Sequence, residues 1–321
     1  MFSLKEELKQ IEIGTPVTFQ NLTVWPLLRR KHASSTGYYL LEEAIRLGLA
    51  RVTEIGAAGT VPELRFENSA ERPVLILDGE ELIGAKQNRV VNLTILAPAG
   101  KTIVIPVTCV EAGRWQATSA EFTSSPQMMY AGLRSERAAG LSANLRAAGS
   151  RAADQGAVWS GIDERARKMS APSQTRAMSA IFEKHSISIE EYVRSFSWTP
   201  YQAGVAFGIV GRIAGFDLFD HPDTMHSVFG KLVRSYALDA IDSTGKMSLE
   251  NLSAWLQHFS DAHSTSHDAI GLGTDIRITG RGQSGAALWA EDRFVHVCGF
   301  ATEAGEQGTW MTRILRPSRR R

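Results

Sequence analysis

The order of the predicted elements constrains the fold more than any other feature. Runs rich in β-branched residues lie at both ends of the chain and flank a middle stretch rich in alanine and arginine. β-Type runs at 17–25, 51–55, 63–67, 73–77, 89–96 and 102–110 surround one predicted helix at 38–47. Strands, then helices, then strands indicate an α+β fold. We therefore expect mainly antiparallel β-sheets with an α-helical middle layer or insertion.

The rest of the chain completes this pattern. Helices are predicted at 132–148, 154–169 and 173–184, strands within 204–219, helices at 220–241 and 249–259, a polar linker at 260–268, and strands at 273–279, 285–289, 293–300 and 309–315. This predicts three regions: a β-rich region at 1–127, a helical insertion or lobe at 128–202, and an α+β region at 203–321. We expect the third region to pack with the N-terminal sheet as one compact unit.

Composition excludes several classes of protein. With 321 residues, 43% of them hydrophobic, and 35 basic against 34 acidic side chains, the chain has neither the signature of disorder nor the basic excess of a nucleic-acid binder. No window approaches the length of a membrane span, and the N-terminus lacks a secretory pattern. Two distant cysteines suit a reducing compartment and exclude a cysteine-based zinc site. We expect a cytoplasmic protein.

One segment is unusually dense in polar groups with chemical uses. Residues 73–77 are apolar throughout, which is typical of a strand buried on both faces, so residues 78–81 should emerge as a loop where that strand ends. The segment continues through 86–89 and Asn92, and a predicted hairpin across 92–110 brings it to residues 109–115. Its candidate members are Glu80, Glu81, Lys86, Gln87, Asn88, Arg89, Asn92, Glu111, Arg114 and Trp115.

Strand phase suggests that these residues converge. Residues 103, 105, 107 and 109 share one face of a strand, and Glu111 follows on that face. A buried carboxylate needs a cation, and Arg89, Lys86 and Arg114 are the local candidates. The hairpin places Arg89 roughly opposite Glu111. We expect Glu80 or Glu81, residues 86–89, Glu111, Arg114 and Trp115 to form one polar cluster.

Two interpretations of this cluster stay open. In the functional one, Glu80, Glu81 or Glu111 acts as a general acid or base or holds a divalent cation, while Lys86, Arg89, Arg114 and Trp115 grip an anionic, ring-bearing ligand with help from Gln87, Asn88 and Asn92. In the structural one, the same residues form a buried network that locks the hairpin to the buried strand. No cofactor can be named from the sequence.

The runs at 79–89 and 109–115 resemble a bacterial family named for gene association with ADP-ribosylglycohydrolases and rhodanese/phosphatase-superfamily proteins. The resemblance extends over most of the chain, including 217–219 and 295–297. It implies an intracellular context linked to ADP-ribose or NAD-derived nucleotides, and supplies no catalytic residues. The expected function is binding, and processing if the protein is an enzyme, of a phosphorylated ribose ligand. The alternative is a non-catalytic ligand sensor or an adaptor for a protein partner.

Other reactive residues are weaker candidates. Cys109 and Cys298 lie in phase with apolar strand residues, which favours buried, inert thiols. The histidines at 258, 263 and 267 are the only His-rich group, and a polar linker is favoured there over a metal site. His296 is either a core histidine or the general base that the polar cluster lacks.

Overall fold

A computed structural model describes residues 3–56, 59–245 and 249–302 and shows an α+β fold, which confirms the predicted class. The strands form three mainly antiparallel sheets. The nine-stranded sheet has the order β1-β3-β13-β14-β18-β17-β16-β15, with β2 also paired to β3. The six-stranded sheet runs β12-β8-β9-β11-β6-β5, and the three-stranded sheet runs β10-β7-β4.

The nine-stranded sheet comprises β1 (Glu12–Ile13), β2 (Val17–Phe19), β3 (Leu22–Leu28), β13 (Gln202–Ile209), β14 (Arg212–Phe219), β15 (His263–Asp268), β16 (Thr274–Gly280), β17 (Gln283–Ala290) and β18 (Arg293–Ala301). The six-stranded sheet comprises β5 (Ala50–Glu54), β6 (Glu63–Asn68), β8 (Glu80–Gly84), β9 (Arg89–Val91), β11 (Thr102–Cys109) and β12 (Phe122–Met128). The small sheet contains β4 (Tyr39–Leu40), β7 (Val74–Ile76) and β10 (Ile95–Ala97).

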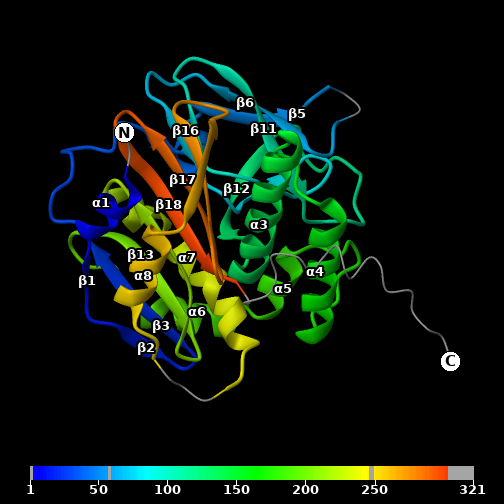
Figure 1. Cartoon of the computed structure of the whole chain (residues 1–321). Coiled ribbons are helices and arrows are strands. Elements are labelled where there is room, and N and C mark those ends of the chain that lie inside the picture. The colour runs from blue at the N-terminus through cyan, green and yellow to red at the C-terminus, as the bar shows by residue number, and fades with distance from the viewer. Residues whose placement is uncertain (1–2, 57–58, 246–248, 303–321) are drawn as a thin grey trace.

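The helices are α1 (Leu4–Lys9), α2 (Leu41–Arg46), α3 (Ala131–Ala148), α4 (Gln155–Lys168), α5 (Ser179–Lys184), α6 (Ser186–Ser195), α7 (Pro222–Ile241) and α8 (Leu252–Ser260). α1 and α8 cover one face of the nine-stranded sheet, and α3 and α7 pack on the other (Figure 1). α7 also contacts β12, and Leu141 and Leu145 of α3 pack in the core beside the six-stranded sheet, so these two helices lie between the large sheets.

Helix α7 shows how the sequence directs this packing. His221 caps its N-terminus by accepting a hydrogen bond from the Asp223 amide, and Pro222 occupies the first turn, where its missing N–H costs nothing. An apolar stripe at helical spacing, with Met225 and Tyr236 fully buried, faces the main core. The predicted helix at 220–241 is confirmed.

Several predicted elements were wrong in detail. The hairpin predicted across 92–110 forms only in part: β9 pairs antiparallel with the end of β11, with Arg89 opposite Cys109, but the chain bends at 92–94 and β10 pairs with β7 in another sheet. The 17–25 run is two strands with a turn at Gln20. The expected loop at 78–81 includes the start of β8, and the expected linker at 260–268 contains β15, an edge strand whose side chains are largely exposed. An exposed edge strand needs no apolar pattern, because its backbone pairs with β16 while its side chains meet water.

Other elements were shifted or missed. Within the predicted helix at 173–184 only α5 is helical before a break at His185, and α1, α6, β1 and β12 were not predicted. The strand predicted at 309–315 lies outside the described residues. The division into three regions stays a prediction, although β3 from the first region pairs with β13 from the third. No helix within the described residues has the length and apolar character to cross a membrane.

Candidate functional site

Arg114 is the centre of the polar cluster predicted from the sequence. Its Nη2 lies 2.6 Å from Glu111 Oε2, and the same nitrogen donates to the Asn88 side-chain oxygen at 2.9 Å. Its Nη1 donates to the Ala85 carbonyl at 2.7 Å. Burial alone would raise the pKa of Glu111, but hydrogen bonds led by Arg114 outweigh it and lower the pKa. Arg114 is therefore the predicted partner of Glu111, and its guanidinium is already occupied by acceptors within the chain.

The same cluster anchors a distant segment. Glu111 forms a β-bridge with Ala177, and the Gly113 amide donates to the Thr175 carbonyl at 2.7 Å. A Cβ atom at Gly113 would lie 2.9 Å from Thr175 Cα, so only glycine allows this approach. This part of the cluster attaches the loop before α5 to the end of β11.

Arg89 and Trp115 form a second part of the cluster. Arg89 is fully buried, and its Nη1 donates to the Gln87 side-chain oxygen at 2.7 Å and contacts Cys109 Sγ. Its Nε and Nη2 have no hydrogen-bond partner within the described residues, but Nη2 forms an ion pair with Glu54 Oε1 at 3.7 Å. Trp115 is 49% exposed, with Lys86 Nζ 5.5 Å and Arg89 Cζ 5.7 Å from its ring centroid. We call the group Trp115, Lys86 and Arg89 the Trp115 edge.

The two adjacent glutamates of β8 have different surroundings. Glu80 pairs with Lys231 at 3.0 Å and accepts from the Ser124 hydroxyl at 2.9 Å, so it belongs to an ion pair with α7. Glu81 is fully buried, and no hydrogen bond of good geometry reaches either oxygen among the described residues. Burial raises the pKa of Glu81 to about 7, opposed by the nearby Ser125 hydroxyl and reinforced by the charge of Glu111. Glu81 is thus the member of the pair nearer to the cluster.

A second buried network joins residues that are distant in the chain, and it was not predicted from the sequence. Arg134 on α3 donates to Asp217 on β14 at 2.7 Å and to Asp78 at 3.4 Å. Arg137, one turn later, contacts Asp78 and donates to the Asn92 side-chain oxygen at 3.3 Å. Asn92 therefore belongs to this central network and not to the Arg114 cluster.

Close packing positions Arg134. Asp78 follows β7, and the next residue, Gly79, turns the chain with a φ of 85°. A Cβ atom there would lie 2.6 Å from Arg134 Cδ, so the turn needs glycine for both conformation and space. The spacing of Arg134 and Arg137 by three residues on a helix, and an aspartate within the apolar run of β14, were the available sequence signals.

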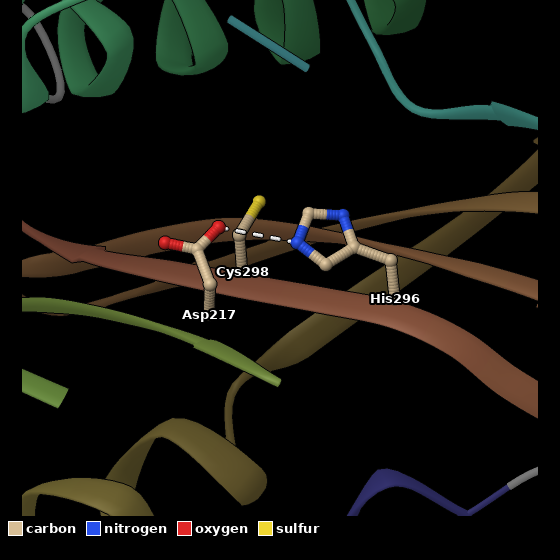
Figure 2. Close-up of side chains that lie close together, drawn as sticks. All are labelled: Asp217, His296 and Cys298. Atoms are coloured by element: carbon tan, nitrogen blue, oxygen red, sulfur yellow. Dashed lines mark hydrogen bonds and ion pairs between the residues drawn. The ribbon is translucent and has the colours of Figure 1, made fainter. Parts of the chain in front are cut away.

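His296 on β18 completes the central network. One ring nitrogen lies 3.1 Å from Asp217 Oδ1 (Figure 2), and the other lies 2.8 Å from the Thr94 hydroxyl. The ring stacks on Phe219 with centroids 4.6 Å apart. Burial alone would raise the pKa of Asp217, but Arg134 and His296 outweigh it and hold the pKa at about 2. His296 therefore approaches the polar segment at Asp78 and Thr94, and not at Glu80.

Asp217, His296 and Cys298 are the residues of the described chain best placed to hold a metal ion. Their ligand atoms lie within 4.8 Å of one another, and Figure 2 shows the three side chains on neighbouring strands. Two facts disfavour a cation here. Asp78 and Asp217 are already neutralised by Arg134 and Arg137, and burial raises the pKa of the Cys298 thiol to about 12. A metal would have to expel that proton beside two arginines.

Two hollows accompany these sites. A groove of about 520 Å³ lies between α4 and the loop before α5, with Ile162 and Ala177 in its floor and Arg167 and Arg176 at its rim. A cavity of about 10 Å³ adjoins the central network, with Asp78, Thr94, Arg277, His296 and Cys298 in its lining. This volume accommodates about one water molecule.

Comparison with known proteins identifies the chain's family. No curated protein and no solved structure matches it. The family model described as "ARG and Rhodanese-Phosphatase-superfamily-associated Protein domain" matches residues 10–300, which include every residue of the two networks above. The chain belongs to this family.

Proposed function

We propose that the protein binds a phosphorylated ribose ligand of the ADP-ribose or NAD class at the Trp115 edge. The observation that carries the proposal is the half-exposed indole ring of Trp115 with two cations beside it. An exposed tryptophan offers a stacking surface for a base, and stacking of one base on an aromatic side chain contributes about 1–3 kcal/mol. An ammonium group suits the phosphates.

The three members of the edge have different roles in this proposal. Trp115 is the most exposed and provides stacking, and Lys86 is partly exposed and contacts the phosphates. Arg89 is fully buried and ion-paired with Glu54, so it holds the site in shape and does not contact the ligand. The family description supports the ligand class by association alone, and the same association supports a cytoplasmic setting.

Processing of the ligand is the less supported part of the proposal. Glu81 and Glu111 have pKa values shifted in opposite directions, which is the pattern of a general acid and a general base. Both are buried, so a ligand reaches neither without movement of the chain. The guanidinium of Arg114 already donates to Glu111, Ala85 and Asn88, which favours the structural interpretation for this part of the cluster. The second candidate function is therefore a non-catalytic ligand sensor or an adaptor.

Thermal denaturation with ADP-ribose, NAD, AMP and ribose 5-phosphate tests the proposal. A ligand at about 100 times its Kd stabilises the folded state by about 2.7 kcal/mol, which corresponds to roughly 5 °C. We expect such a rise in the wild type, a much smaller one in Trp115→Ala and Lys86→Gln, and the full rise in Tyr201→Ala. Tyr201 is the matched control because it is 48% exposed and carries Arg30 over its ring. Equal rises in all four proteins, or none in the wild type, would refute the proposal.

A further inference from the structure

The edge strand β15 lacks the protection that the other edges of the two large sheets have. β12 contains Pro126 and a register shift between Ser124 and Met128, and β5 carries the exposed Arg51. β1 and β2, at the far end of the nine-stranded sheet, have only two and three residues. By contrast, β15 pairs with β16 in unbroken register over six residues and contains no proline, lysine or arginine. Folded proteins guard exposed strand edges against pairing, so an unguarded edge indicates a pairing surface.

The alternation of hydrogen bonds along β15 defines which backbone groups face away from β16. The Ala269 amide donates to the Gly273 carbonyl at 3.4 Å, so this pair, which continues the register of β15 and β16, is a hydrogen-bonded one. Hydrogen-bonded and non-hydrogen-bonded pairs alternate along an antiparallel ladder. The odd-numbered residues of β15 therefore bond β16, and the N–H and C=O groups of the even-numbered residues, 264, 266 and 268, point to the open edge.

Two of these three outward residues have backbone groups open to a further strand. The carbonyl of the third, Asp268, accepts from the Arg151 guanidinium. Among the residues that the structure describes, no hydrogen bond from outside the sheet reaches the backbone of Ser264 or Ser266, and both residues are exposed. The open part of the edge is therefore short and centred on Thr265.

The sequence around Thr265 is a palindrome, His-Ser-Thr-Ser-His at 263–267. An identical antiparallel strand, related by a two-fold axis at Thr265, places Ser264 opposite the second copy's Ser266, and these outward groups then exchange N–H···O bonds. The two threonines face each other at the axis, and the five side chains include no lysine, arginine, aspartate or glutamate that would repel its counterpart. We propose that β15 pairs in this register with β15 of a second copy of this chain and joins the nine-stranded sheets of the two molecules.

Neighbouring registers use the open edge less well. A two-fold axis at Ser266 would pair Ser264 with Asp268, whose carbonyl Arg151 already occupies. An axis at Ser264 would pair Ser266 with Ala262, whose amide already donates to the last turn of α8. Only the central axis pairs both serines of each copy with free backbone groups. The palindrome also favours a second copy over an unrelated strand, because an identical strand repeats it.

Disulfide cross-linking of the full-length protein tests the register. The Cβ atoms of a non-hydrogen-bonded antiparallel pair lie about 4.5 Å apart, which allows a disulfide, so Thr265→Cys should form a covalent dimer with oxidised glutathione. Ser264→Cys is the matched control on the same strand and should stay monomeric, because its two copies are displaced by about 7 Å along the strands. A mixture of Ser264→Cys and Ser266→Cys should form the heterodimer. The native cysteines, Cys109 and Cys298, are buried and do not compete.

Analytical ultracentrifugation measures the same interaction without added cysteines. We expect a concentration-dependent equilibrium between monomer and dimer in the wild type, and a dimer Kd raised about 5-fold or more in Thr265→Lys, where two like charges meet at the axis. Thr123→Lys should keep the wild-type Kd, because Thr123 is an exposed threonine on the edge strand β12 of the other large sheet. A wild type that is monomeric at every concentration, equal Kd values in the two lysine variants, or equal disulfide formation by Thr265→Cys and Ser264→Cys would overturn the proposal.

Discussion

Replacement of Arg134 by methionine tests the energetics of the central network. The guanidinium is fully buried, and without it the carboxylate of Asp217 keeps, among the described residues, only its hydrogen bond from His296. Removal of one partner from a buried ion pair typically costs 3–5 kcal/mol. Because Asp78 retains Arg137, we expect a cost near the lower bound, about 3 kcal/mol.

The pH dependence of this cost follows from the pKa of Asp217. The folded-state pKa of about 2 lies below the usual 3.8, so the carboxylate contributes stability that is present above about pH 4 and lost as the pH falls to about 2. The lowered pKa corresponds to about 2 kcal/mol of stability. The destabilisation of Arg134→Met should therefore shrink by about that amount between pH 7 and pH 2.

Urea denaturation across this pH range measures both quantities. Arg146→Met is the control, because Arg146 lies on the same helix and donates a hydrogen bond to the Thr279 hydroxyl at the surface. Asp217→Asn combined with Arg134→Met should restore part of the lost stability, since no unpaired charge is then buried at Asp217. A cost equal to that of Arg146→Met, or one unchanged by pH, would refute the reasoning.

Three further substitutions test other parts of the account. Glu81→Gln should raise the free energy of unfolding by about 3 kcal/mol at pH 8 but not below pH 4.5. The reason is that the folded-state pKa of Glu81, about 7, disfavours folding once the glutamate of the unfolded chain ionises. Urea titrations measure the gain, and Glu71→Gln, at the surface, should show none. Arg114→Lys should cost about 3 kcal/mol by loss of the planar fork, and leave ADP-ribose affinity unchanged in calorimetry. Gly113→Ala should cost about 1–3 kcal/mol in denaturant unfolding, because the methyl group meets the Thr175 backbone at 2.9 Å, and an unchanged midpoint would contradict this.

The sequence predicts the elements that have strong local signals. The helix α7 and the hairpin of β13 and β14 have caps, turns or apolar stripes within a few residues, and their bounds agree with the structure. The pairing of β10 with β7 and of β3 with β13 joins residues that are distant in the chain, so no local pattern reports it. The edge strand β15 is polar because its side chains meet water, which makes it resemble a linker.

The Arg114 part of the candidate site could be predicted because its members lie close together in the sequence. Glu111 and Arg114 lie three residues apart, and the strand phase indicated an inward carboxylate with a local cation. The central network joins Asp78, Arg134, Asp217 and His296, which are distant in the chain. They meet only because α3 packs against both the nine-stranded sheet and the turn between β7 and β8. Asn92, assigned to the first cluster from its position in the chain, belongs to the second because the chain bends there.

Calorimetric titration of ADP-ribose into the wild type, Trp115→Ala and Tyr201→Ala tests the central claim most directly. Loss of one stacking contact of about 1–3 kcal/mol raises Kd between about 5-fold and 150-fold. We expect saturable one-site binding to the wild type and Tyr201→Ala, with Kd raised by that factor in Trp115→Ala. Equal Kd values in the three proteins would place the ligand elsewhere, and absence of binding to the wild type would contradict the proposed function.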